Sequence, residues 1–341
     1  MQNFCYLGYE INCSGSNNFT INALYDKAGK AMRPILSAIA RFNIPVKVSI
    51  KLFNSYVAPI MLYNVENWGG LTDKKINNFS LNNLLTDTND AKASNIHKKF
   101  LKYTLGVTKS CPNVAVLGDT GEIPLMLKGY RLMLQYWHRI NNLPHDTLVN
   151  MALLENIDLK SNWIATIEKL INVFNLPNSV RNASKLRCDA KRNIHSIYVD
   201  YWKNNININR LEFYCKYKNK FEFEKYLNIS KFEKRKRISK LRCSDHDLEI
   251  EKGRHKKLPR EARTCKLCIN GSIENEEHFL FECKFYDDIR RITKFGGTPD
   301  TLFEINTLDI LGDYVLHAFD KKRDKELLNH LFTNAILLYT E

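Results

Sequence analysis

The sequence lacks the features of a membrane or secreted protein. It contains no run of roughly 18 apolar residues, so we expect no transmembrane helix and no membrane partner. Its start, Met1-Gln2-Asn3-Phe4, has neither a basic segment nor an apolar stretch with a cleavage site, so we expect no signal peptide. The nine cysteines are mostly scattered and odd in number, which argues against a disulfide framework. A cytoplasmic or nuclear location, not a secreted one, is therefore expected.

Acidic residues are in short supply. The chain has 37 Asp and Glu against 51 Lys and Arg, a net charge of +14. Residues 211–260 alone carry sixteen basic and eight acidic residues, a net of +8. This excess favours a polyanionic partner, RNA or DNA. A hydrophobic content of 44% over 341 residues is ordinary for a globular chain of two or three domains.

Apolar periodicity predicts a mainly α-helical fold. Residues 4–11 favour one short β-strand, and a long amphipathic helix follows it, with Thr20 as the expected N-cap. Its apolar stripe, with spacings of three and four, comprises Ile21, Leu24, Tyr25, Ala28, Ala31, Met32, Ile35, Leu36 and Ile39.

Further helices are expected along the chain. Pro45 suits the first turn of a second helix, and Pro59 kinks or ends this helix. Helices are also expected around Ile96–Leu105, around Leu125–Trp137 and over much of 150–240. Residues 71–94 are rich in Asn, Asp, Thr and Lys and favour a linker or a loose insertion.

Four residues near the C-terminus have the spacing of a zinc site. Cys265 and Cys268 form a Cys-x-x-Cys turn, nine residues precede His278, and four more precede Cys283. Two thiolates can converge on one ion from such a turn, and the His and Cys complete a tetrahedron. Four ligands leave no open position, so the predicted zinc is structural. The alternative is a surface cysteine pair with an unrelated His and Cys.

Basic residues form the candidate nucleic-acid contacts. Such residues neutralise phosphates and release counterions, which gives affinity without sequence choice. The alternatives for the run Lys234–Arg237 are a solvated helix face or a nuclear localisation signal. The predicted contacts are Lys27, Lys30, Arg33, Lys231, Lys234, Arg235, Lys236, Arg237, Lys240, Arg242, Arg254, Lys256, Lys257 and Arg260.

Two carboxylate patterns bear on catalysis. Asp245, Asp247, Glu249 and Glu251 alternate with apolar residues, which favours the polar face of a half-buried strand over a metal-binding row. The stretch Phe285-Tyr286-Asp287-Asp288 has the form of a polymerase Asp-Asp motif. It runs into Ile289–Ile292, which favours a helix instead of a catalytic hairpin. We therefore expect no catalysis at either place.

Several short motifs occur in order along the chain. They are Tyr6-Leu7-Gly8 before a basic helix, Val57-Ala58-Pro59-Ile60, Glu66-Asn67-Trp68-Gly69, Leu105-Gly106-Val107, Tyr136-Trp137, Leu241-Arg242, Gly253-Arg254, Pro259-Arg260 and the four zinc ligands. Together they resemble the C-terminal part of a reverse transcriptase of the non-LTR (LINE-type) retrotransposons. Asn64 stands where the family usually has glycine. The resemblance covers residues 4–70, 95–140 and 238–295.

The resemblance implies a thumb-like helical bundle after a short β-strand, a helical connector and a small zinc-stabilised C-terminal domain. The family's catalytic aspartates lie upstream of the strand at residues 4–11, so binding without polymerase activity is expected. The implied divisions are the end of the palm and the thumb (1–75), a linker (76–94), a post-thumb region (95–145), a basic helical connector (146–237), a CCHC zinc domain (238–295) and a helical tail (296–341).

Three functions remain open. The first is a reverse-transcriptase fragment that holds template RNA or target DNA. The second is a self-standing zinc-dependent regulatory protein that binds nucleic acid or protein and derives from a retroelement. The third is a metal-dependent nuclease that uses the carboxylates of residues 245–251.

Overall fold

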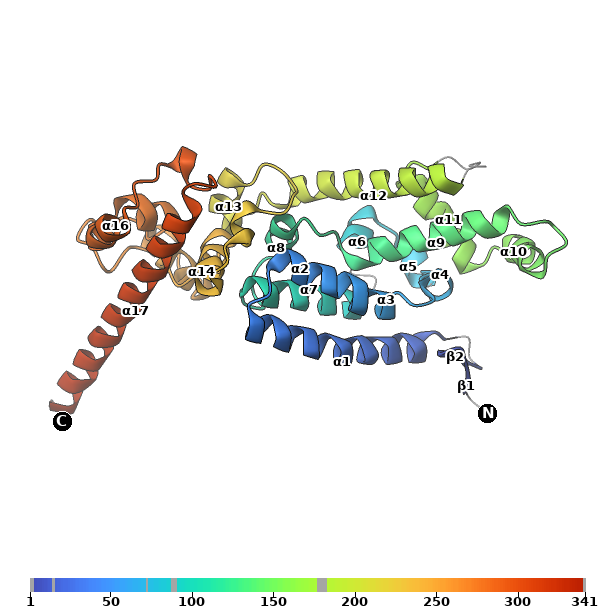
Figure 1. The fold of residues 1–341 in the computed structure, drawn as a ribbon, viewed down its shortest axis with the longest axis horizontal. Helices are drawn as coiled ribbons and strands as arrows, with labels where there is room; N and C mark the ends of the chain where they lie inside the picture. The colour runs from blue at the N-terminus through green and yellow to red at the C-terminus, as the bar shows by residue number, and fades with distance from the viewer. Residues whose placement is uncertain (1–2, 14–15, 72, 87–90, 177–182, 340–341) are drawn as a thin grey trace. The chain divides into compact units, whose positions relative to one another are not determined.

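The computed structural model describes residues 3–13, 16–71, 73–86, 91–176 and 183–339, and it is mainly helical (Figure 1). Within these residues the β-structure that forms a sheet is a single antiparallel pair of strands. None of the described helices is long and apolar enough to cross a membrane. The predicted mainly α fold class is confirmed.

The chain forms two compact units, each assembled from separate segments. Unit 1 comprises Met1–Ile44, Val48–Leu101 and Thr120–Ile206, and unit 2 comprises Pro45–Lys47, Lys102–Asp119 and Asn207–Glu341. The boundaries expected after residues 145 and 237 therefore lie inside unit 1 and unit 2, respectively. Contacts between segments distant in sequence, and not local composition, define these units.

The helices and strands are numbered in chain order. The strands are β1 (Asn3–Tyr6) and β2 (Tyr9–Asn12). The α-helices are α1 (Asn18–Phe42), α2 (Val46–Leu52), α3 (Ala58–Met61), α4 (Val65–Trp68), α5 (Asp73–Asn77), α6 (Leu81–Leu85), α7 (Ala91–Leu105), α8 (Asn113–Thr120), α9 (Leu125–Asn141), α10 (Leu148–Asp158), α11 (Asn162–Val173), α12 (Ala183–Asn205), α13 (Glu212–Tyr217), α14 (Phe232–Arg242), α15 (Glu249–His255), α16 (Asp287–Thr293) and α17 (Leu308–Tyr339). Two π-helices span Phe53–Val57 and His278–Glu282.

The N-terminal segment is a hairpin and not the single strand expected. β1 pairs with β2 in antiparallel register, with Tyr6 opposite Tyr9. Leu7 and Gly8 form the two-residue turn, and both have positive φ, 49° and 81°. A positive φ at both central residues matches the right-handed twist of paired strands, and glycine adopts it without strain. The expectation missed this turn because Leu-Gly lacks the Asn or Asp that usually marks one.

Helix α1 follows the predicted apolar stripe. Leu24, Tyr25, Ala28, Met32 and Ile39 are buried on one face, where α1 packs against α3 and the π-helix Phe53–Val57. The predicted N-cap was wrong. The helix begins at Asn18, two residues before Thr20, and the Thr20 side chain is buried within its first turn.

The second predicted helix is interrupted where Pro59 requires it. The helical path from Val46 to Met61 passes through the π-helix Phe53–Val57 before α3, which has Pro59 in its first turn. Proline has no N–H to donate to the preceding turn, so a wider turn before it accommodates the missing hydrogen bond. The helix begins at Val46, one residue after Pro45, which was expected in its first turn.

The expected linker contains ordered helix. Ser80 caps α6 by accepting a hydrogen bond from the backbone N–H of Asn83, and Leu84 and Leu85 are buried. Their burial against unit 1 outweighs the polar composition that suggested a linker. The part of this prediction at residues 87–90 lies outside the described residues.

Helix α9 is the centre of unit 1. The helices α4, α10, α11 and α12 pack against it. Gly129 on α9 permits the close approach of α4, because a Cβ there would lie 3.1 Å from Cγ2 of Val65. The Trp163 indole, from α11, donates to the carbonyl of Glu66 at 2.7 Å and joins α11 to α4.

A buried histidine makes the stability of unit 1 depend on pH. His97 is buried and its ring stacks on Phe53, with centroids 5.2 Å apart. Burial, with a smaller effect from Lys128 and Lys98, lowers the pKa of His97 well below its usual 6.5. The unfolded chain therefore takes up this proton as pH falls below about 6.5, while the folded unit does not.

We expect the free energy of unfolding of unit 1 to fall below pH 6.5, with a slope of up to about 1.4 kcal/mol per pH unit from His97. Urea unfolding between pH 7.5 and 5, followed by tryptophan fluorescence, measures it, because Trp68, Trp137, Trp163 and Trp202 all lie in unit 1. His97→Gln should reduce the slope and the exposed His255→Gln should retain it. Equal slopes in the two variants would contradict this assignment.

Candidate metal centre and basic surface

The four predicted zinc ligands converge in unit 2. One ligand atom from each of Cys265, Cys268, His278 and Cys283 lies within 4.8 Å of all the others. Cys265, His278 and Cys283 are buried, and Cys268 is partly exposed. Four soft or borderline ligands in a closed, mostly buried cluster could hold a metal ion such as zinc.

A short hairpin presents the two cysteines of the Cys-x-x-Cys turn. Thr264 and Ile273 form an antiparallel bridge, and the Cys265 N–H donates to the carbonyl of Ser272 at 2.8 Å. Gly271 turns the chain between them with a φ of 64°. The other two ligands lie at the ends of the π-helix His278–Glu282, where the Cys283 N–H donates to the His278 carbonyl at 2.8 Å.

The distances between ligand atoms fit a tetrahedral zinc ion. Bonds of about 2.3 Å to sulfur and 2.0–2.1 Å to nitrogen place two sulfurs about 3.8 Å apart and a sulfur and a nitrogen about 3.6 Å apart. The Sγ atoms of Cys265 and Cys283 are 3.9 Å apart. Sγ of Cys268 lies 3.4 Å from Nε2 of His278.

The His278 ring is oriented by two neighbours that the sequence analysis did not single out. Its Nδ1 lies 3.3 Å from a carboxylate oxygen of Glu282, which leaves Nε2 facing the thiols. Asn275 accepts from the backbone N–H of His278 at 2.8 Å. A carboxylate behind a histidine fixes the ring and its tautomer in metal sites. The signal for Glu282 was its position four residues after His278, one helical turn away.

The contact between Cys265 and Cys283 shifts the pKa values of their thiols in opposite directions. A hydrogen bond from Cys283 lowers the pKa of Cys265 to about 4. The same contact, together with burial, raises the pKa of Cys283. One thiolate beside one thiol is therefore favoured at neutral pH, and thiolate is the form that binds a metal.

A buried ion pair supports the cluster from outside. The ammonium of Lys322, on α17, lies 2.6 Å from both carboxylate oxygens of Glu274, and both side chains are at most 3% exposed. Glu274 also accepts from the backbone N–H of Glu249 at 2.7 Å, and Sγ of Cys265 lies 3.9 Å from it. Burial raises the pKa of Glu274, and Lys322 opposes that rise.

Aromatic side chains near the ligands form a small, partly buried apolar shell around the cluster. Phe279 and Tyr286 are fully buried with ring centroids 5.0 Å apart, and the Tyr314 hydroxyl of α17 donates to the carbonyl of Phe279 at 2.5 Å. Phe281 and Phe285 are only half-buried. This shell joins the metal-ligand segment to α17.

Helix α14, which carries the basic run Lys234–Arg237, packs against α17 (Figure 1). Lys234 pairs with Asp309 at 2.8 Å and Asp313 at 2.9 Å, and Arg237 pairs with Asp320 at 3.1 Å. The prediction that Lys234 binds nucleic acid does not fit its burial, because its charge already holds two helices together. The acidic face of α17 was the sequence signal for this pairing.

Arg235 is also buried, with its guanidinium donating to the carbonyl of Ile229 at 2.7 Å and lying 5.5 Å from the centre of the Phe232 ring. Burial lowers the pKa of Arg235. Its predicted contact with a phosphate is therefore wrong for this conformation, because a buried guanidinium cannot reach an external strand.

Arg242 is the centre of a buried polar network. Its Nε donates to Asp119 at 3.2 Å, and its Nη2 lies 3.2 Å from Glu224. The Tyr226 hydroxyl donates to the other oxygen of Asp119 at 2.7 Å, and the Phe303 ring lies 4.5 Å from the guanidinium carbon. Arg242 is wholly buried, so its predicted role in nucleic-acid binding is wrong in this structure, and its role is structural.

The remaining predicted cations lie nearer to solvent. Among the described residues of the predicted set, Lys27, Lys30, Arg33, Lys231, Lys256 and Lys257 are exposed, and Lys236, Arg237, Lys240, Arg254 and Arg260 are half-buried. Lys27, Lys30 and Arg33 belong to α1 in unit 1, and all the others belong to unit 2.

The two carboxylate patterns are occupied by structural contacts. The predicted strand over residues 245–251 was wrong, because α15 begins at Glu249. Asp245 accepts from the backbone and hydroxyl of Thr108, and Glu251 pairs with Arg210 and Arg254. The helix predicted after Phe285 is confirmed as α16.

Asp287 and Asp288 occupy the first turn of α16, where carboxylates complement the helix dipole. Asp287 pairs with Arg290, and Asp288 pairs with Lys321 on α17. Lys321 and its hydrogen bond lower the pKa of Asp288. This arrangement differs from a hairpin that presents two carboxylates to a metal.

Comparison of the chain with protein-family models, with curated proteins and with solved structures gave no match.

Proposed function

We propose that this protein binds nucleic acid through unit 2, in which one structural zinc ion holds the segment that presents basic residues. The observation that carries the proposal is the juxtaposition of the four-ligand cluster with the basic segment directly before it in the chain. This basic segment contains Lys256, Lys257 and Arg260, all within nine residues before Cys265. The hairpin that begins at Thr264 and presents Cys265 comes next in the chain.

The sequence resemblance supports a more specific proposal. We propose that the chain acts as the C-terminal part of a LINE-type reverse transcriptase and holds template RNA or target DNA. Polymerisation would depend on aspartates outside this chain, and we assign no part in it to Asp287 and Asp288. A self-standing regulatory protein is the second candidate, and the reading frame upstream of Met1 distinguishes them.

The exposed cations provide the test. Replacing Lys231, Lys256 and Lys257 together by glutamine should weaken binding to all nucleic-acid sequences alike. Removing one phosphate contact should reduce the slope of log affinity against log salt by about 0.7 for single strands or 0.9 for duplex. The triple variant should therefore flatten the slope by about 2 to 3.

Filter binding at several salt concentrations measures these slopes. The matched control replaces Lys160, Lys203 and Lys325, which are exposed residues outside the predicted set. Both variants remove three positive charges, so their affinities and slopes should differ only if binding takes place at the surface formed by Lys231, Lys256 and Lys257. Equal slopes and affinities for the wild type and the first variant would reject the proposed surface of exposed cations.

A further inference from the structure

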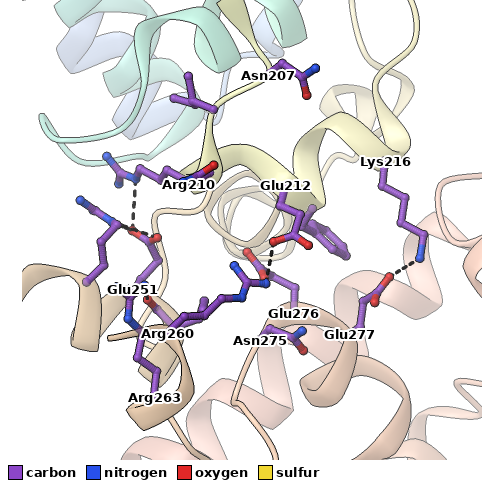
Figure 2. Close-up of a pocket in the computed structure, with 15 residues that line it drawn as sticks. Asn207, Arg210, Glu212, Lys216, Glu251, Arg260, Arg263, Asn275, Glu276 and Glu277 are labelled. Atoms are coloured by element: carbon purple, nitrogen blue, oxygen red, sulfur yellow. Dashed lines mark hydrogen bonds and ion pairs between the residues drawn. The ribbon is translucent and has the colours of Figure 1, made fainter. Parts of the chain in front are cut away.

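A cleft in unit 2 is lined by five cationic and four acidic side chains. It has a volume of about 750 Å³, within the range of pockets that enclose a small organic molecule. Its walls come from the start of α13, from α15 and from the segment before His278, as Figure 2 shows. Five cationic side chains line it: Arg210, Lys216, Arg254, Arg260 and Arg263.

One side of the cleft carries fixed positive charge. The buried carboxylate of Glu251 lies between Arg210, at 3.1 Å, and Arg254, at 2.8 Å, so one carboxylate balances two guanidinium groups. Arg263 donates to the backbone carbonyls of Leu258 and Ile250 at 2.8 and 3.1 Å. These contacts hold the guanidinium groups in place and leave their charge only partly neutralised.

The other side carries cations whose partners can move. Arg260 pairs with Glu212 at 2.6 Å, and Lys216 pairs with Glu277 (Figure 2). The carboxylates of these pairs are 68% and 38% exposed. Exposed ion pairs contribute little stability, so a competing anion can displace such carboxylates at small cost.

Glu276 does not compete in the same way. It is buried, accepts from the Ser244 hydroxyl at 3.3 Å and lies 3.0 Å from Nε2 of His246. Its charge is therefore directed into unit 2 and away from an incoming anion. The two displaceable carboxylates are those of Glu212 and Glu277.

We propose that this cleft binds the phosphate backbone of an unpaired nucleic-acid strand, with phosphate oxygens replacing Glu212 at Arg260 and Glu277 at Lys216. A guanidinium can bind phosphate, like a carboxylate, through two parallel charge-assisted hydrogen bonds, so a phosphate can take the place of Glu212 at Arg260. A cleft of about 750 Å³ has room for a nucleotide of an unpaired strand, whereas a nucleotide of a duplex would first have to leave its base stack. This inference rests on the proposed function and locates the contact within unit 2.

The exposed residues Lys256 and Lys257 lie between α15 and Arg260, so a strand that approaches the cleft from that side meets further positive charge. Ile208, 44% exposed, and Asn207 also line the cleft and offer an apolar and a polar surface to bases. The arrangement therefore places phosphate-binding groups and base-contacting groups within one cleft.

The two members of the pair Arg260–Glu212 make opposite predictions. Arg260→Gln should weaken the binding of a fluorescein-labelled single strand of about 12 nucleotides by about tenfold, because it removes a charge-assisted hydrogen bond. Glu212→Gln should strengthen it severalfold, because the competing carboxylate is gone. If the pair were only structural, both variants would weaken binding or neither would change it.

Fluorescence anisotropy on the zinc-loaded full chain measures both, with Lys325→Gln and Glu304→Gln as matched exposed controls of the same charge change. The controls should shift affinity by less than about twofold. Circular dichroism establishes that each variant is folded.

Competition separates the sources of the phosphate. Unlabelled single strand should displace the probe, whereas duplex, a nucleoside monophosphate and inorganic phosphate should need far higher concentrations. If the mononucleotide displaces the probe at the same concentration as the single strand, the ligand of the cleft is a free nucleotide and not a strand. If the wild type binds the strand but the cleft variants have the same affinity as their controls, the cleft is not the binding site and only this inference fails. If the wild type binds no strand even at low salt, the proposed function itself is rejected.

Discussion

Replacing Cys268 by serine is expected to abolish zinc binding and to unfold the metal-ligand segment of unit 2. Zinc in a four-ligand structural site contributes about 10–16 kcal/mol of apparent binding free energy. This is as large as the whole stability of a typical domain, about 5–15 kcal/mol. The free energy of metal binding is therefore also free energy of folding for the segment around residues 264–286.

Cys268 is the best position for this test because it is the least buried of the three cysteines, so serine disturbs packing least. Metal analysis of the purified protein should give one zinc per chain for the wild type and close to none for the variant. Hydrogen exchange of unit 2 should accelerate, while tryptophan fluorescence, which reports on unit 1, stays unchanged. The exposed Cys188→Ser serves as control, and full zinc content in Cys268→Ser would exclude the assigned ligand set.

Replacing Arg242 by methionine is expected to destabilise unit 2 by about 3–5 kcal/mol, the second large effect. The substitution leaves the carboxylate of Asp119 fully buried without its cation. The hydroxyl of Tyr226 still donates to Asp119, but one neutral hydrogen bond does not replace a guanidinium in a low-dielectric interior. The unpaired carboxylate of Asp119 should therefore draw water into the core.

Urea unfolding monitored by circular dichroism and hydrogen exchange measures the destabilisation. The double variant Arg242→Met with Asp119→Asn should be more stable than the sum of the single effects predicts, because the unpaired charge is gone. Arg323→Met, a 67% exposed arginine, is the control and should change stability by less than about 0.5 kcal/mol. Strict additivity in the double variant would show that the two groups do not interact.

Features with a local signal were predictable from the sequence. The stripe of α1 repeats within one helix, and the zinc ligands lie within nineteen consecutive residues, so spacing alone identified both. The same holds for α16, whose first residues carry carboxylates. Local spacing determines which face or which turn a residue occupies, and the structure agrees at these places.

Features that depend on distant partners were not predictable. Arg242 was expected at a nucleic acid because it is basic, yet its partner Asp119 lies 123 positions earlier. Lys234 is buried by Asp309, 75 positions later. A charge count records the sign of each residue and not its tertiary partner, so it overestimated the basic surface of α14.

The pair of Glu274 and Lys322 has a consequence for the order in which unit 2 is completed during synthesis. The two residues are 48 positions apart along the chain, and all four metal ligands are made before Lys322. At about 5–20 residues per second, a ribosome takes roughly 2 to 10 s to add those 48 residues. Throughout that interval the carboxylate beside Cys265 has no ammonium to accompany it into the interior. We therefore expect the nascent segment with the four candidate ligands to stay open to water and to a metal ion until α17 emerges and closes over it.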